Sequence, residues 1–166
     1  MCIRDRGYVD HPAHWVDFFG LSGKGGHVDK AAQLAKNRKQ GADGEKKVRE
    51  IIQALCGDSF GSQMTVKVDD VTSRIDFIVN RGGVLEFIEV KTGNATLTKN
   101  QAVARDVLNR TSDSDKPGAV RLGASEQRSA LIGKRQNDRI SGRFHQIYAD
   151  SADDIERLVD ILLGTV

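Results

Sequence analysis

Asp76, Glu89 and Lys91 are charged residues inside segments that are otherwise apolar. Two carboxylates held close together can bind Mg²⁺ or Mn²⁺, which prefer oxygen ligands. A lysine beside them can orient or deprotonate a water molecule and can offset the charge of a phosphate. This combination suits metal-assisted hydrolysis of phosphodiester bonds. The alternative is a structural ion pair of the carboxylates with Lys91 or Arg74, and the charges would then be costly to bury without a ligand.

A tight turn decides whether these charges meet. The two segments are rich in β-branched and aromatic residues, and Gly82-Gly83 between them is typical of a two-residue hairpin loop. Counting outward from that loop places Asp76 opposite Glu89, with Cβ atoms about 5 Å apart. Lys91 is two residues further along and points to the same face. A register shift of one residue would separate the carboxylates.

The order of these residues resembles the core of the PD-(D/E)xK nucleases, in which an acidic residue precedes a Glu-x-Lys strand. Asp76 and the tripeptide 89–91 carry that resemblance. Glu45, near the start of an apolar helical stripe, and Gln101, near the start of another helix, match two further positions. The alternatives are a carboxylate that stabilises a helix N-terminus for Glu45 and a plain surface glutamine for Gln101. The resemblance covers about residues 41–123, and Ile75 stands where the family often has proline.

The resemblance implies an α/β (α+β) fold with a restriction-endonuclease-like core, a mixed central sheet flanked by helices. It implies Mg²⁺ or Mn²⁺ as the cofactor, held by Asp76, Glu89, the Val90 carbonyl and Glu45. Lys91 would position the attacking water, and Gln101 would orient the substrate or Lys91.

Composition and charge are consistent with a nucleic-acid substrate. The chain has 166 residues, of which 39% are hydrophobic and 29% charged, which indicates a globular protein with no membrane segment. Its two cysteines form no CxxC motif, so a structural zinc site is not expected. The net charge is only +2, but basic residues outnumber acids over 24–50 and 121–145. Either these are ordinary solvated surfaces, or they bind a phosphate backbone. The residues expected to contact nucleic acid are Lys46, Arg74, Lys99, Arg128, Lys134, Arg135, Arg139 and Arg143.

Periodicity and capping signals predict the remaining elements. They are a helix over 30–39, a helix over 43–56 with Asp43 as its cap and Gly57 as its stop, a strand over 62–69, a helix over 98–110 capped by Thr98, a strand over 119–122, a polar loop or weak helix over 124–143, a strand over 144–148 and a last helix capped by Ser151.

The first 40 residues differ from the domain expected over 41–166. Residues 1–6 show no periodicity and are set aside. The stretch 8–21 resembles the segment that precedes the toxin domain of Rhs/YD-repeat polymorphic toxins, although His11 and Phe18 replace its usual prolines. That resemblance implies a secreted effector delivered into the cytoplasm of a target cell, with DNA as the favoured substrate and a cognate immunity protein as a partner. The alternatives are a toxin that cuts transfer RNA, a cytoplasmic housekeeping nuclease of restriction or repair type, and an inactive nucleic-acid-binding module.

Overall fold

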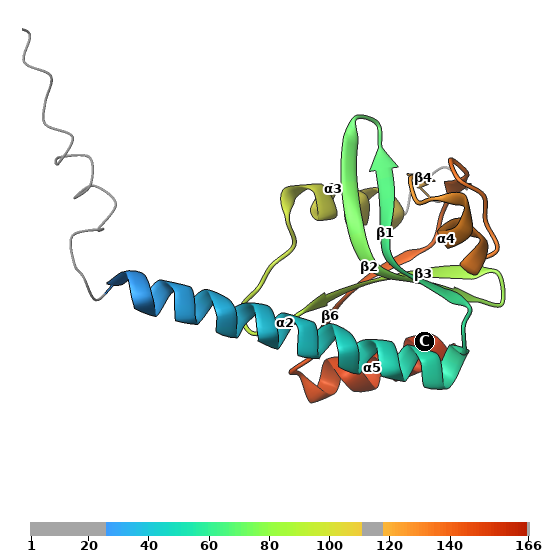
Figure 1. Ribbon diagram of the computed structural model, residues 1–166. Helices are drawn as coiled ribbons and strands as arrows, with labels where there is room; N and C mark the ends of the chain where they lie inside the picture. The colour runs from blue at the N-terminus through green and yellow to red at the C-terminus, as the bar shows by residue number, and fades with distance from the viewer. Residues whose placement is uncertain (1–25, 111–117, 166) are drawn as a thin grey trace, which may run out of the picture. The chain divides into compact units, whose positions relative to one another are not determined.

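The computed structural model describes residues 26–110 and 118–165 and divides the chain into two units, residues 1–39 and 40–166 (Figure 1). The described residues form four helices and a six-stranded sheet, which confirms a mixed α/β fold. Among these residues, no helix is both long enough and apolar enough to cross a membrane. The toxin-junction stretch 8–21 lies outside the described residues.

The sheet is mixed, and its strand order is β5-β4-β1-β2-β3-β6. All neighbours are antiparallel except β3 and β6, which are parallel. The strands are β1 (Phe60–Val68), β2 (Val71–Arg81), β3 (Val84–Lys91), β4 (Val120–Leu122), β5 (Arg139–Ile140) and β6 (Arg143–Tyr148).

The hairpin of β2 and β3 has the predicted register. Its two turn glycines have φ values of 58° and 95°, the left-handed conformation that a two-residue type I′ loop requires. Arg81 pairs with Val84, and the pairing continues to Phe77 opposite Ile88. The glycines therefore set the alignment on which the carboxylate cluster depends.

Helices cover both faces of the sheet (Figure 1). They are α2 (Gly26–Cys56), α3 (Lys99–Leu108), α4 (Glu126–Leu131) and α5 (Ala152–Leu163). One core joins Val48 and Ile52 of α2 to Leu158 of α5 and to side chains of β2, β3 and β6. The other core joins Ala104 and Leu108 of α3 to β1, β2, β3 and β4. The central strands are thus buried on both faces.

The sheet splits at Asp76, where the pairing of β2 with β3 ends; we call this point the fork. Ile75 and Ile78 both belong to the α3 core, whereas Phe77 belongs to the α2 core, so strict alternation along β2 breaks beside Asp76. On the neighbouring strand, Gln63 has a φ of 52°, which is unusual for a residue other than glycine. Beyond this point β1 and β2 curl away from β3 (Figure 1).

The two helices predicted over 30–39 and 43–56 are one continuous helix, α2. Asp43 lies inside it and is not a cap. The glycines at 41 and 44 suggested a break, because glycine disfavours helices by about 1 kcal/mol. Gly44 has a packing reason instead: a Cβ there would lie 2.8 Å from Cγ2 of Thr92.

The remaining elements follow the predictions closely, with one exception. Ser151 caps α5 by accepting a hydrogen bond from the Asp154 N–H at 3.3 Å, and Gly57 ends α2 in the left-handed conformation. The polar stretch 124–143 was predicted as a loop or weak helix, and it contains the short helix α4 and the short strand β5. Elements of six and two residues are too short to produce a clear periodic signal.

Candidate functional site

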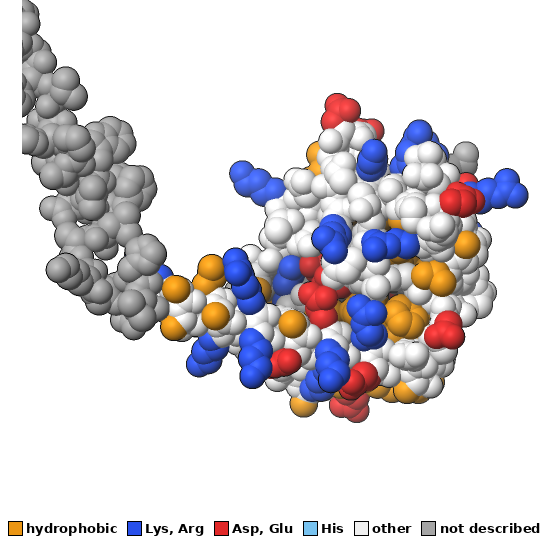
Figure 2. Space-filling model, in the orientation of Figure 1, with side chains coloured by type: hydrophobic (Ala, Val, Ile, Leu, Met, Phe, Trp, Pro, Cys, Tyr) orange, Lys and Arg blue, Asp and Glu red, His pale blue; other side chains and the backbone are white. Residues whose placement is uncertain are grey.

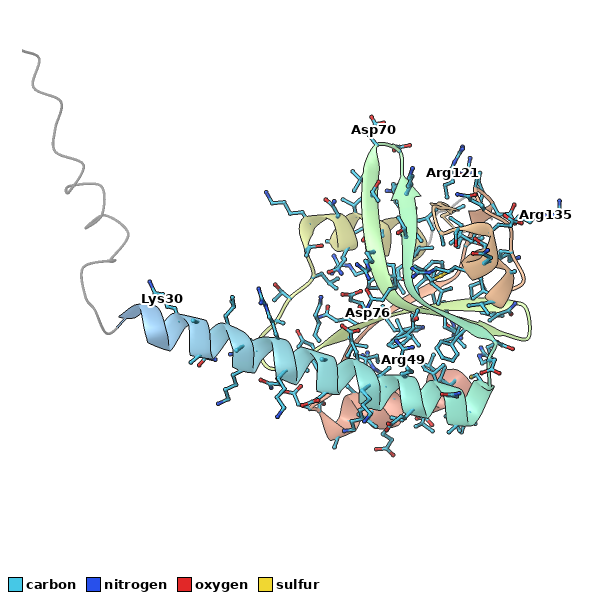
Figure 3. All side chains as sticks on the ribbon, in the orientation of Figure 1. Lys30, Arg49, Asp70, Asp76, Arg121 and Arg135 are labelled. Atoms are coloured by element: carbon cyan, nitrogen blue, oxygen red, sulfur yellow. The ribbon has the colours of Figure 1, made fainter. Side chains whose placement is uncertain are left out.

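The five residues predicted to act together do meet, at the fork between β2 and β3. They come from α2 (Glu45), β2 (Asp76), β3 (Glu89 and Lys91) and α3 (Gln101). Figure 2 shows acidic side chains in the middle of this face with Lys and Arg side chains around them, and Figure 3 labels Asp76 in that area. Their side chains form two hydrogen-bonded groups, one around Asp76 and one around Glu89.

The first group links Asp76 to Glu45 through a glutamine. The Gln63 side-chain amide donates to Oδ1 of Asp76 and to Oε2 of Glu45, both at 3.0 Å. Gln63 was not expected from the sequence, because an uncharged polar residue in a strand that also contains Ser62, Thr65 and Lys67 carries no distinguishing signal. Its left-handed backbone, visible only in the structure, aims its amide at both carboxylates.

Asp76 also takes over a hydrogen bond that the sheet would otherwise make. The regular pairing of β2 with β3 ends at Phe77, one position before the expected Asp76–Glu89 pair. Instead, the Val90 N–H donates to Oδ2 of Asp76 at 2.8 Å. The two carboxylates are therefore neighbours, as predicted, but they are not a regular cross-strand pair.

The second group links Glu89, Lys91 and Gln101. Lys91 Nζ donates to Oε1 of Glu89 at 2.7 Å and to Oε1 of Gln101 at 3.2 Å, and the Gln101 amide donates to the same Glu89 oxygen. The Thr98 N–H donates to Oε1 of Gln101 at 3.0 Å, which completes a capping box at the start of α3. This cap fixes the position of Gln101, and Gln101 in turn holds Lys91.

The Asp76 and Glu89 carboxylates are buried beside a single lysine, Lys91, which does not balance their two negative charges. Asp76 is 9% exposed and Glu89 is 2% exposed. Burial, reinforced by the nearby charge of Asp76, raises the pKa of Glu89 to about 7. Burial also raises the pKa of Asp76, and burial together with the Asp76 charge raises the pKa of Glu45. Lys91 lowers the pKa of Glu89 but does not compensate for these effects.

One oxygen at the centre of the site has no partner among the described residues. Oε2 of Glu89 is buried and accepts no hydrogen bond there. A buried carboxylate oxygen normally has a partner, so an unpaired one requires an explanation. A bound divalent cation would pair this oxygen and relieve the repulsion between Asp76 and Glu89.

The donor set therefore fits a hard divalent cation. Asp76 and Glu89 offer carboxylate oxygens, and the backbone of Val90 is tied to Asp76. Among the described residues, no three His, Cys, Asp or Glu side chains are grouped as a ready metal-binding cluster. Mg²⁺ typically takes only one or two carboxylates and completes its shell with water and substrate phosphates. Glu45 lies further out and reaches Asp76 through Gln63.

Seven of the eight predicted nucleic-acid contacts fall into three groups. The first group lies near Asp76: the charge of Arg74 acts on Asp76, and the Arg128 guanidinium donates to the backbone carbonyl of Gln63 at 3.2 Å. The exposed Lys46 and Lys99 stand on the helices that carry Glu45 and Gln101. Three others belong to the segment between α4 and the end of β5, namely Lys134, Arg135 and Arg139.

Arg143 has a different environment. With Arg81 and His145 it surrounds Glu86, which is fully buried on β3. Nε of Arg143 donates to Glu86 at 3.1 Å, and Nε2 of His145 lies 2.9 Å from the same carboxylate. These contacts outweigh burial and lower the pKa of Glu86 to about 2. The Arg143 guanidinium is thus part of a structural charge cluster.

Comparisons of the chain with protein-family models, with curated proteins and with solved structures gave no match. Any function of this protein must therefore be inferred from the side chains at the fork.

Proposed function

We propose that this protein is a divalent-metal-dependent nuclease with a restriction-endonuclease-like core. The observation that carries the proposal is the pair Asp76 and Glu89, buried together with an unpaired oxygen and in contact with Lys91. In a structural ion pair, by contrast, both carboxylate oxygens would have partners and the cations would at least balance the acids, as they do around Glu86. The PD-(D/E)xK pattern supports the same interpretation.

Each residue of the site has a role in this proposal. Asp76, Glu89 and the Val90 carbonyl would hold Mg²⁺ or Mn²⁺, which when bound supplies charge stabilisation to a phosphodiester undergoing hydrolysis. Lys91 stands beside Glu89 with its ammonium group oriented by Gln101, where it can position the attacking water by donating a hydrogen bond to it. Gln63 keeps Asp76 in position and couples it to Glu45.

We favour DNA as the substrate, on the strength of the family resemblance. The family resemblance and the stretch 8–21 together support a toxin delivered into a target cell, where an acidic immunity protein would cover the basic surroundings of the site. Cleavage of transfer RNA on the same fold and an inactive binding module are alternatives that a cleavage experiment separates from this proposal. A cytoplasmic housekeeping nuclease is the third alternative, and a small acidic open reading frame directly downstream of this gene would favour the toxin over it.

The test is cleavage of supercoiled plasmid and of total tRNA by the full chain, with Mg²⁺, with Mn²⁺ and with EDTA. Cleavage of plasmid that requires a metal is expected. Asp76→Asn and Lys91→Ala should abolish it. The matched control is Glu156→Gln, an exposed acid on α5, which should leave cleavage unchanged. Full activity in EDTA would contradict the metal mechanism, and full activity of either site variant would contradict the site.

A further inference from the structure

Beyond the fork, one face of the sheet carries exposed side chains that no described helix covers. On β1, Met64 and Val66 point into the α3 core, as do Val120 and Leu122 on β4 and Ile140 on β5. The alternate residues of these strands therefore point the other way. We call the surface they form with β2 the outer face; its residues are Thr65, Lys67, Thr72, Arg74, Arg121 and Arg139.

Three cations stand side by side across the outer face. Lys67 on β1 is directly opposite Arg121 on β4, and Arg121 is directly opposite Arg139 on β5. All three are exposed. Like charges at directly opposed positions destabilise a sheet, and neighbouring strands are only about 4.8 Å apart. A row of this kind lowers the stability of the folded sheet, and a bound anion would offset the repulsion.

Acids of the sheet do not neutralise this row. Apart from Asp76 at the fork, strands β1, β2, β4 and β5 contain no Asp or Glu. Within the described part of the chain, the side chains of Lys67, Arg121 and Arg139 make no hydrogen bond or ion pair. Their charges are available to a ligand.

The row borders a cavity of about 600 Å³. Arg110, two residues after the end of α3, adds a fourth cation to its lining, whereas Asp69 is the one acid among the described lining residues. Asn137 contributes a neutral amide. The cavity is therefore built to attract a negatively charged group, and no apolar ligand is suggested.

The outer face continues to the candidate active site. Arg74 on β2 pairs with Thr65 on β1, so it belongs to the same face as Lys67. Its charge also acts on Asp76 and Glu45. Figure 3 labels Asp76 near the middle of the view and Arg121 above and to the right of it. In the same orientation, Figure 2 shows Lys and Arg side chains between the central acids and the position of Arg121.

We propose that the outer face binds the phosphate backbone of the nucleic-acid strand that reaches Asp76 and Glu89, with Lys67, Arg121 and Arg139 as the remote contacts. The identity of this polyanion rests on the proposed function. Aromatic residues make up only 5% of the chain, so base stacking is not the basis of binding. Binding through cations to phosphates is independent of base sequence and sensitive to salt.

The test measures binding separately from cleavage. The full chain and the double variant Arg121→Gln/Arg139→Gln are titrated onto fluorescent duplex DNA and single-stranded RNA in EDTA, over a series of salt concentrations. The variant should bind at least about tenfold more weakly at low salt. The slope of log affinity against log salt should become shallower by about two, one for each phosphate that an arginine no longer neutralises.

Two further variants separate this role from a general effect of charge. Arg105→Gln/Arg157→Gln also removes two surface arginines, from α3 and from α5 at the opposite edge of the sheet, and should bind within about twofold of the wild type. Arg121→Lys/Arg139→Lys keeps the charge and should recover most of the affinity. The melting temperature of the glutamine variant should not fall, because repulsion in the row is relieved.

An unchanged affinity and salt slope in Arg121→Gln/Arg139→Gln would overturn the inference, as would an equal loss of affinity in the control. Failure of the wild type to bind either polymer would also overturn it. If binding behaves as expected but no polymer is cleaved with a metal present, the outer face stands and the nuclease proposal fails.

Discussion

Two buried glutamates on strand β3 lie three residues apart and have opposite electrostatic environments. Glu86 is surrounded by Arg81, Arg143 and His145, and its pKa is lowered to about 2. Glu89 has a single lysine and an acidic neighbour, Asp76, and its pKa is raised to about 7. Both side chains are almost fully removed from solvent.

The difference distinguishes a carboxylate whose two oxygens both have partners from one that has an unpaired oxygen in the same strand. Both carboxylate oxygens of Glu86 have cationic or imidazole partners, and the one buried atom without a described partner in this cluster is Nε of Arg81, a donor that a cation would not pair. Glu89 retains a buried oxygen with no partner among the described residues, and the proposed metal would pair it. Burial alone would not have distinguished them.

The strongest contrast is expected from Glu89→Gln. Loss of this carboxylate should reduce metal-dependent cleavage by about 10³-fold, because several kcal/mol of charge stabilisation depend on the metal that it would hold. The melting temperature should stay the same or rise, since repulsion with Asp76 disappears. Cleavage rates and thermal melts on the same preparations test both parts, and a stable, fully active variant would contradict the assignment.

Glu86→Gln should have the opposite profile. It removes the counter-charge that Arg81 and Arg143 share, which should lower the free energy of unfolding by about 2–3 kcal/mol. This is below the value for a fully buried pair, because both arginines are partly exposed. Urea denaturation measures the loss. Cleavage per folded molecule should be unchanged, and a variant that is stable but inactive would show that Glu86 belongs to the site.

Acid should act on the Glu86 cluster in a defined pH range. A carboxylate with a lowered pKa stabilises the folded state fully above its ordinary pKa of 4.5, and this contribution is lost as the pH falls towards about 2. Up to about 3 kcal/mol is expected from a lowering of this size. The groups facing this carboxylate are Arg81, Arg143 and His145. Urea denaturation between pH 5 and pH 2 should show less loss in Glu86→Gln than in the wild type; equal losses would contradict the prediction.

The smallest effect is expected at Gln63, which acts through Asp76 and Glu45. Gln63→Gly and Gln63→Ala both remove the bridging amide and should lower cleavage by about tenfold, with a higher metal concentration needed for half-maximal rate. Gln63→Ala should also be less stable than Gln63→Gly, with a free energy of unfolding lower by about 1 kcal/mol, because alanine disfavours the left-handed backbone that glycine adopts freely. A loss of stability in both variants without any change in metal requirement would indicate a purely structural role.

Much of the hairpin and its neighbours could be predicted from the sequence. The two glycines at 82–83 require a tight turn, and the alternation on each side sets the register. Capping residues located α3 and α5, because a cap is a local interaction that sequence neighbours decide. The single helix α2 was not predicted, since its glycine at position 44 is required by packing against Thr92, a contact distant in sequence.

What the sequence determined by itself is the pairing of residues 77–81 with 84–88, and with it the gathering of Asp76, Glu89 and Lys91 at one end of a hairpin. What only the tertiary structure decided is how these charges are balanced. The fork at Asp76, the left-handed Gln63 and the contrast between Glu86 and Glu89 depend on which distant side chains share a buried space. Desolvation and pairing energies arise from that three-dimensional neighbourhood, and no local pattern encodes them.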